Sequence, residues 1–371
     1  GASREVSVSH YEERMQRDLD AILARVADLG ARVETAARAA VHALLHRDRQ
    51  KAAETILQDH PVNRGTREVD RLCHVFVARH LPSAGVLRTI SSVLRMSVAI
   101  ERVGDYAVTI ARETVQLDAD VPEPIKRDIE LVAESSLTLF AQAMRAFNEQ
   151  NPELARGTKG QGSRPRRRTS HRVFHDLVRV GEDQAPPLAD LFALLMCIQR
   201  LERIGSQALN ICEETIFATT GEVKQPKVYN VLFVDRANDG ASIMAEAIAR
   251  RTFPHSGRYT SAGWQPSTKV LPAVRAFLDR TGHDVGGLAP TPFDATYGEL
   301  ENVHVVVSLD GDALARIPEL PFHTTVLTWQ VSPSTTAAQD MQAEEWLQAL
   351  FRDLSGRIQD LMRTLRGEKA D

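Results

Sequence analysis

Apolar residues recur every three or four positions through most of the first 220 residues, which is typical of amphipathic helices packed on one side. The first such stripe runs from Leu19 to Leu44. Further helical patterns follow at about 66–80, 86–116, 125–148, 171–179 and 187–218. Pro82, VPEP at 121–124 and APP at 185–187 separate them, because proline lacks the amide hydrogen that a helix interior needs. The pattern predicts six long helices in antiparallel bundles.

A repeated phrase divides this helical part into two. The segment AIERVGDYAVTIARET at 99–114 returns at 199–215 as QRLERIGSQALNICEET. In this alignment Glu101 matches Glu202, and Gly104 matches Gly205. So long a period indicates a duplicated domain and not a solenoid. The expected fold is therefore all-α here, a pair of three-helix bundles at 8–118 and 122–218.

Beyond residue 218 the pattern changes to short apolar runs that alternate with helical segments. Strands are expected at 228–234, 258–261, 303–308 and 325–328, and helices at 243–250, 270–280 and 340–365. Such alternation predicts a small parallel α/β sheet. The chain is thus expected to be multidomain, with a linker at 219–227 and an α/β domain at 228–371.

Composition narrows the classes of function. No run of about 18 or more uncharged apolar residues occurs and no apolar signal segment opens the chain, so we expect a cytoplasmic protein. The net charge of −4 gives no general attraction to nucleic acid. Cys73, Cys197 and Cys212 lie in apolar helical patterns. We interpret them as buried thiols in a reducing compartment, with neither disulfide nor metal-ligand spacing.

Acidic residues on the helices form the first candidate site. Glu101 and Asp105 are four residues apart, so their carboxylates lie on one helix face. Asp59 and Asn63 have the same spacing on the preceding helix. If the two faces meet, they offer a cation up to four oxygen ligands; the alternative is a solvated surface. Pro61 is expected to kink any helix that carries Asp59 and Asn63.

Three phrases in the helical part carry a family resemblance. They are DHPVNRGTREVD at 59–70, RHLPSAGVLRTI at 79–90 and IERVGDYAVTIA at 100–111, and the last returns in part as LERIGSQALNIC. Over about residues 8 to 218 the chain resembles the PhoU family of bacterial phosphate-signalling regulators. The resemblance implies paired three-helix bundles whose acidic motifs hold metal, with Fe, Zn, Mg or Ca as open identities.

The resemblance also implies partners. PhoU-like proteins lie at the cytoplasmic side of the cell membrane and contact the ATPase of a phosphate ABC transporter or a phosphate sensor kinase. They repress phosphate-starvation signalling, so we expect the same negative regulation here. Membrane association would be peripheral and through these partners, and homodimerisation stays open.

Departures from the family pattern weaken the metal expectation. In the second bundle the motif's Asp is Ser206, which leaves Glu202 as its acidic residue. The usual Asp of the P-x-A-x-L-R turn is Gly85. The expected partner helix reads RGTKGQGSRPRRRTSHR at 156–172, and its glycines and proline predict a solvated loop. An acidic partner or anionic lipid is the alternative role of this basic run, whereas its lack of aromatics argues against nucleic acid.

The α/β part opens on VLFVDRANDGASIMAEA at 231–247, a buried strand that passes through a turn into a helix. Further phrases are YTSAGWQP at 259–266 and the segments 271–287 and 303–333. In this order they resemble the low-molecular-weight protein tyrosine phosphatases and the arsenate reductases of the same fold. The resemblance implies a Cys-x5-Arg loop after the first strand, in which amides and the arginine hold an anion beside the thiolate.

The loop lacks this chemistry. Asp235 stands at the nucleophile position and Ala241 at the arginine, while Ser332-Pro333 replaces the Asp-Pro of the general acid. No cysteine follows Cys212, which excludes a relocated thiol. The degenerate phosphate loop comprises Asp235, Asn238, Asp239, Gly240, Ala241 and Ser242. Two aspartates oppose a bound anion, so we expect a pseudoenzyme with no catalytic residues.

Three alternatives stay open. The first is a Mg²⁺-dependent phosphohydrolase with Asp235 as phosphoryl acceptor and carboxylates from Asp310 and Asp312. The second is a cation held by Asp235, Asn238 and Asp239. The third is a metal-binding assembly protein unrelated to phosphate.

Overall fold

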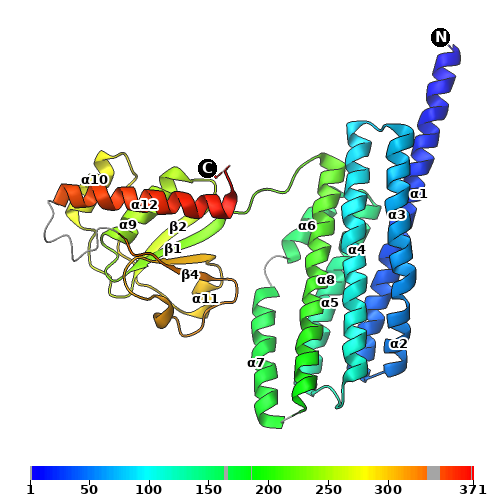
Figure 1. The fold of residues 1–371 in the computed structure, drawn as a ribbon, viewed down its shortest axis with the longest axis horizontal. Helices are drawn as coiled ribbons and strands as arrows, with labels where there is room; N and C mark the ends of the chain where they lie inside the picture. The colour runs from blue at the N-terminus through cyan, green and yellow to red at the C-terminus, as the bar shows by residue number, and fades with distance from the viewer. Residues whose placement is uncertain (1, 163–165, 185, 332–342, 369) are drawn as a thin grey trace. The chain divides into compact units, whose positions relative to one another are not determined.

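The computed structural model describes all residues except 1, 163–165, 185, 332–342 and 369 (Figure 1). The chain divides into two compact units. We call Gly1–Lys224 the helical unit and Gln225–Asp371 the α/β unit. The division falls inside the predicted linker 219–227, although the last helix of the helical unit continues to Thr220 and so takes up the first two linker positions.

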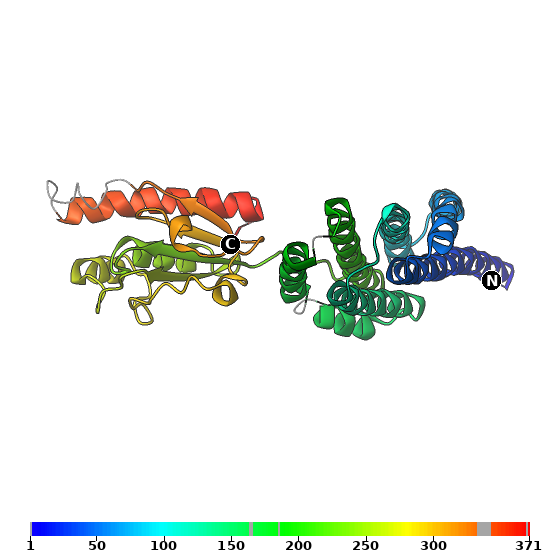
Figure 2. The same cartoon turned by 90° about the horizontal axis from the view of Figure 1, so that it is seen from below.

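The helical unit is a duplicated bundle in which the middle helix of each half is split. Its helices are α1 (Ala2–His46), α2 (Arg49–Leu57), α3 (Asp59–His80), α4 (Ala84–Gln116), α5 (Glu123–Asn148), α6 (Pro152–Gly162), α7 (Arg166–Gln184) and α8 (Leu188–Thr220). The helices lie side by side, and Figure 2 looks along most of them. Helix α4 packs on α1 and on α8, so one continuous core runs through both halves.

The repeated phrase occupies the same place in each half. Ile110 and Ile211 are fully buried in the core. One turn later Thr114 and Thr215, also buried, donate their hydroxyls back to the carbonyls of those isoleucines at 2.8 and 2.9 Å. Such back-bonding satisfies a buried hydroxyl within its own helix. The matched contacts support duplication, and the predicted pair of bundles is confirmed.

Two local predictions need correction. Pro61 does not kink the helix that carries Asp59 and Asn63, because the helical run is interrupted at Gln58 and Pro61 lies in the first turn of α3, where no amide hydrogen is needed. The described parts of the basic run are helical and not a loop, since residues 156–162 belong to α6 and residues 166–172 to α7. Asn151 caps α6 by accepting the Leu154 amide at 3.0 Å. Packing on the core then outweighs the low helix propensity of the run's glycines.

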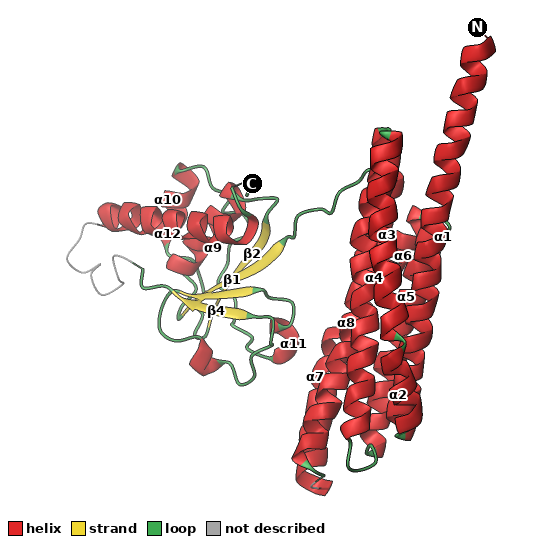
Figure 3. Ribbon diagram, turned by 45° about the vertical axis from the view of Figure 1, so that its right-hand side comes forward, coloured by secondary structure: helices red, strands yellow, loops and turns green. Residues whose placement is uncertain are grey.

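The α/β unit holds one parallel four-stranded sheet covered on both faces (Figure 3). The strands are β1 (Tyr229–Asp235), β2 (Gly257–Gly263), β3 (Val305–Ser308) and β4 (Thr325–Thr328), in the order β2-β1-β3-β4. The helices are α9 (Ala241–Thr252), α10 (Pro272–Arg280), α11 (Tyr297–Leu300) and α12 (Ala343–Arg366), with a 3₁₀ turn at Leu314–Arg316. All four predicted strands are confirmed, with bounds within two residues.

Alternation along the central strand separates the two faces. Val231 and Phe233 of β1 point into the core formed with α9, α10 and α12. Val234 points into a smaller core on the other face, with Leu300 of α11 and Ile317. Because β1 is buried on both faces, it reads as a continuous apolar run. The polar residue that ends this run, Asp235, is carried to the carboxyl edge of the sheet.

Candidate functional site

The β1–α9 turn, residues 235–242, lies at the carboxyl end of the central strand. After β1 the chain forms β2 on one side of β1, and after β2 it crosses back to form β3 on the opposite side of β1. Open parallel sheets bind ligands at such switch points, and the start of the following helix adds amides that attract anions. This turn is therefore the place in the α/β unit where a site is expected on topology.

The carboxylate of Asp235 occupies the centre of this turn. Its Oδ1 accepts the Asn238 amide at 2.6 Å, and its Oδ2 accepts the Ser242 amide at 2.9 Å. Asp235 is only 8% exposed. One amide comes from the turn and the other from the first turn of α9, so both donors converge on one buried anion. That anion is part of the chain.

Asn238 connects the turn to its surroundings. Its backbone is left-handed, with φ of 49°, a conformation that asparagine tolerates better than most residues. Its side-chain amide donates to Ser242 Oγ at 2.8 Å, and its Oδ1 accepts the Thr291 amide at 2.8 Å. Asn238 and Ser242 are fully buried. Two residues of the predicted phosphate loop thus contact each other, and Asn238 also holds a distant segment.

The segment after β2 runs against the turn, and sequence reasoning did not identify it. Backbone amides of Gln265, Ser267 and Leu271 donate to turn carbonyls at 2.8, 2.8 and 2.9 Å. At the end of β2, a Cβ on Gly263 would lie 2.8 Å from the Arg236 carbonyl oxygen. Only glycine permits this approach without a backbone shift. The glycine of the phrase YTSAGWQP is the only hint of this in the sequence.

Charge in the turn is negative and is partly balanced by hydrogen bonds. Burial raises the pKa of the Asp235 carboxyl, the hydrogen bonds from Ser242 and Asn238 lower it, and the nearby charge of Asp239 raises it. Asp239 itself accepts the Ser267 hydroxyl at 2.6 Å. The turn's one cation, Arg236, is exposed and donates to the Gln265 side chain at 2.8 Å.

Gly240 and Ala241 supply backbone to the turn and no chemistry. Gly240 is buried at the N-cap of α9, where its carbonyl accepts the Met244 amide at 2.9 Å. Ala241, which the sequence analysis matched to the family's arginine, begins α9 and is half-buried. A methyl group cannot hold an anion as a guanidinium does.

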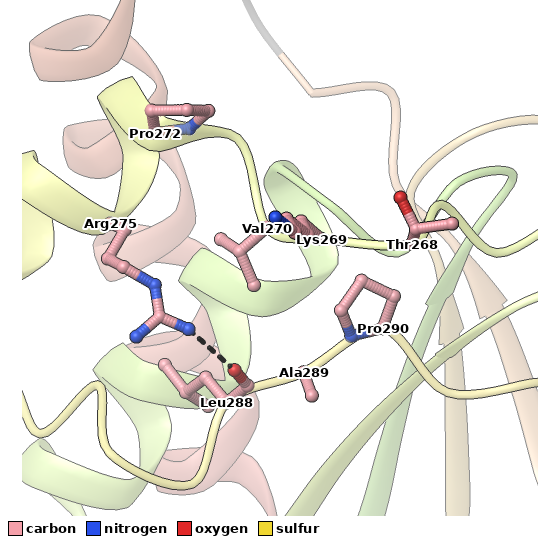
Figure 4. A pocket seen from close by; sticks show the side chains of 8 residues that line it. All are labelled: Thr268, Lys269, Val270, Pro272, Arg275, Leu288, Ala289 and Pro290. Carbon is pink, nitrogen blue, oxygen red and sulfur yellow. Dashed lines mark hydrogen bonds between the residues drawn. The ribbon is translucent and has the colours of Figure 1, made fainter.

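A cavity of about 370 Å³ lies beside the turn (Figure 4). Its walls are Thr268, Lys269, Val270, Pro272, Arg275, Leu288, Ala289 and Pro290. Arg275 on one wall donates to the Leu288 carbonyl at 3.1 Å, as the dashed line in Figure 4 marks. None of these wall residues belongs to the degenerate phosphate loop, so the cavity is a neighbour of the turn and not its interior.

The other carboxylates proposed for this edge lie on the exposed segment after β3. Asp310 and Asp312 are both exposed, and Asp312 accepts the Leu314 amide at 3.0 Å just before the 3₁₀ turn. Ser332 and Pro333, the positions matched to the general acid, lie outside the described residues.

In the helical unit, the faces of α3 and α4 that carry acidic residues do meet. Asn63 donates to Asp59 Oδ2 at 2.7 Å. Asp59 Oδ1 and Asn63 Oδ1 are buried and have no hydrogen-bond partner. Burial raises the pKa of Glu101, and the charges of Asp105 and Asp59 raise it further, against the charge of Arg67. The structure thus places Asp59 near Glu101 and Asn63 beside Asp59, and two buried side-chain oxygens of Asp59 and Asn63 lack hydrogen donors.

The remaining members of the predicted metal set contribute less. Asp105 is exposed as a residue, although partial burial of its carboxyl and the charge of Asp59 raise its pKa. Glu202 is half-buried on α8, and Ser206 donates to its backbone carbonyl at 3.3 Å. Within the described parts of the chain, no three His, Cys, Asp or Glu side chains stand together as a metal-binding group.

The three thiols are buried and free, as the sequence predicted. Among the described residues, no helix combines the length and apolar character needed to cross a bilayer.

Fold and site together define a two-part protein, a duplicated helical bundle joined to a phosphatase-like α/β domain. The PhoU domain model matches residues 26–114 and 129–215, and the model of low molecular weight phosphotyrosine protein phosphatase matches residues 230–342. The chain therefore contains two PhoU domains followed by a low-molecular-weight phosphatase-like domain. The resemblances to the PhoU family and to the low-molecular-weight phosphatases, stated from the sequence, are confirmed.

Individual proteins resemble each part. A phosphate-specific transport system accessory protein PhoU homolog of Rhizobium meliloti (strain 1021) is 24% identical over 221 residues, which cover 59% of this chain and 93% of that protein. The crystal structure of PhoU from Pseudomonas aeruginosa is 26% identical, with a TM-score of 0.53, and covers 56% of this chain and 99% of its own. A thioredoxin-dependent arsenate reductase of Corynebacterium glutamicum is 23% identical, with a TM-score of 0.31 over 42% of this chain and 75% of its own.

Proposed function

We propose that this protein regulates phosphate transport and represses phosphate-starvation signalling in a bacterial cytoplasm, by binding and not by turnover. The observation that carries the proposal is the match of the helical unit to nearly the full length of phosphate-specific transport accessory proteins. We place its partners at the inner face of the cell membrane, namely the ATPase of a phosphate transporter, a phosphate sensor kinase, or both.

The α/β unit in this proposal is a pseudophosphatase. The unit contains no cysteine, so a thiolate nucleophile is missing. Asp235 is a poor replacement, because each of its oxygens already accepts an amide and the residue is almost fully buried. A phosphoryl-accepting aspartate needs an accessible oxygen and a bound Mg²⁺. The exposed positions of Asp310 and Asp312 do not favour them as Mg²⁺ ligands beside Asp235.

A second proposal concerns a cation in the first PhoU domain. Asp59 Oδ1 and Asn63 Oδ1 are buried without hydrogen donors, and a cation is one partner that would satisfy both. Glu101 would add a third oxygen, and a positive charge would relieve the repulsion that raises the pKa of Glu101. When bound, the metal would supply charge neutralisation between α3 and α4. The residues that would hold it are Asp59, Asn63 and Glu101.

Elemental analysis of the purified full-length protein tests the cation. We expect a bound divalent or trivalent metal in the wild type and its loss in the double variant Asp59→Ala with Glu101→Ala. Asp28→Ala is the matched control, because this carboxylate is exposed on α1 and pairs with Arg32 at 2.8 Å. Metal that persists in the double variant, or is absent from the wild type, contradicts the assignment.

Gene deletion with complementation tests the regulatory proposal against the enzymatic alternative. In the host that carries this gene, deletion should raise starvation-regulated alkaline phosphatase activity in phosphate-rich medium. The full chain and its Asp235→Asn variant should both restore repression, because binding needs no nucleophile. A deletion without effect on this reporter would refute the regulatory role. Mg²⁺-dependent release of phosphate from an aryl phosphate, abolished by Asp235→Asn, would instead establish the phosphohydrolase.

A further inference from the structure

The β1–α9 turn satisfies its anion-binding amides with its own side chain. Amides at the start of a helix carry partial positive charge and attract anions. Here the Asn238 and Ser242 amides point at the two oxygens of a single carboxylate, at 2.6 and 2.9 Å. One hydrogen donor on each of two oxygens is also the pattern formed when a free carboxylate or phosphate binds such amides. The ligand in this case is Asp235.

The same turn is held from outside, so its shape does not depend on an added ligand. Asn238 bridges to Ser242 and to Thr291, which belongs to a segment 53 residues further along the chain. Backbone hydrogen bonds from the segment after β2 hold the carbonyls of the turn, and Gly263 packs against its backbone. Many loops become ordered only when their ligand binds, because the ligand supplies the contacts that favour the closed form. This turn already has those contacts.

An external oxyanion would have to displace the Asp235 carboxylate from the amides. The displaced charge would remain buried without donors, which is unfavourable in a site only 8% exposed. Asp239 adds a second negative charge beside it. Phosphate, arsenate and sulfate therefore compete against a ligand that is covalently attached and always present.

We propose that Asp235 is a built-in anionic ligand that holds the α/β unit permanently in its anion-bound shape and closes the turn to inorganic oxyanions. The α/β unit then presents the same surface at every phosphate concentration. The inference depends only on the turn and stands whether or not the helical unit regulates transport.

Titration calorimetry and thermal unfolding of the full-length protein with inorganic phosphate test the proposal. All three tryptophans, Trp264, Trp329 and Trp346, lie in the α/β unit, so their fluorescence follows the unfolding of this unit. The wild type should show no phosphate binding and no change of Tm beyond that caused by chloride at equal ionic strength. Asp235→Gly should have a lower Tm, should bind phosphate, and should recover part of the lost Tm with phosphate and not with chloride.

Asp239→Asn is the matched control, because it removes the same charge from the same turn and leaves the Asp235 hydrogen bonds in place. It should bind no phosphate. Should Asp235→Gly fail to fold in chloride, its refolding in phosphate is measured by the same fluorescence, and recovery supports the proposal. Phosphate binding by the wild type as strong as that by Asp235→Gly would overturn it. So would an Asp235→Gly variant that neither binds phosphate nor is stabilised or refolded by it.

Discussion

Substitution of Gly263 by alanine tests how closely the β1–α9 turn is packed. The added Cβ would lie 2.8 Å from the Arg236 carbonyl oxygen, and 2.9 Å from both the backbone nitrogen and the Cβ of Asn238. Atoms of this kind cannot move away as the end of a flexible side chain can. The turn must therefore shift by a few tenths of an ångström, which strains the hydrogen bonds that hold Asn238 and Asp235.

Overpacking of a well-packed core costs about 1–3 kcal/mol in the free energy of unfolding. For a unit of this size, each kcal/mol lowers Tm by about 2–4 °C. Tryptophan fluorescence during heating reports this transition, and far-UV circular dichroism follows the mostly helical remainder as an internal reference. Gly287→Ala is the matched control, since a Cβ there meets nothing within 4 Å. If Gly263→Ala unfolds at the same temperature as Gly287→Ala, the claim that the turn packs tightly against Gly263 is refuted.

Three further predictions follow from the structure. The hydrogen bond with His80 is the main cause that lowers the pKa of the Asp18 carboxyl below 3.8 in the folded protein. The ionised carboxylate therefore stabilises the fold above pH 3.8, and this stabilisation is lost as the pH falls through the pKa of Asp18 in the folded state. Because the Asp18 side chain is 35% exposed, Asp18→Asn should lower the free energy of unfolding of the helical unit by only about 1 kcal/mol at pH 7, and by less in acid. Urea unfolding at several pH values measures this cost, and a cost independent of pH contradicts the prediction. Asn238→Ala should cost about 2 kcal/mol or more by tryptophan-detected unfolding, because it leaves buried polar groups without partners; a loss under half that value would refute the bridge. Burial raises the pKa of Cys73 and of Cys212 to about 12, so a thiol reagent at pH 8 should label neither before denaturant is added.

Periodicity was enough to predict most of the fold, because long amphipathic helices and a buried strand leave strong patterns. The stripe from Leu19 to Leu44 and the β1 run are both buried as expected. Short helices were missed where composition opposed them. The first part of the basic run is helical because residues of α6 such as Ala155 and Thr158 are buried against the core. The core residues that they contact lie far from them in the sequence, so a local pattern could not predict this packing.

The site was predicted as a position and not as an arrangement. The sequence placed Asp235 between a strand and a helix and identified Asn238 and Ser242 as its neighbours. It did not predict that the carboxylate would turn inward to the amides, because aspartate in such a place can equally face solvent or a cation. The supports at Gly263 and Thr291 come from other segments, which only the folded chain brings to the turn.

Partner capture tests the central proposal most directly. Tagged full-length protein and its Asp235→Asn variant are recovered from the native host, grown with and without phosphate, and the bound proteins are identified by mass spectrometry. We expect both forms to recover the phosphate transporter ATPase or the phosphate sensor kinase, because binding resides in the PhoU domains. Recovery of neither protein under either condition would contradict the regulatory function.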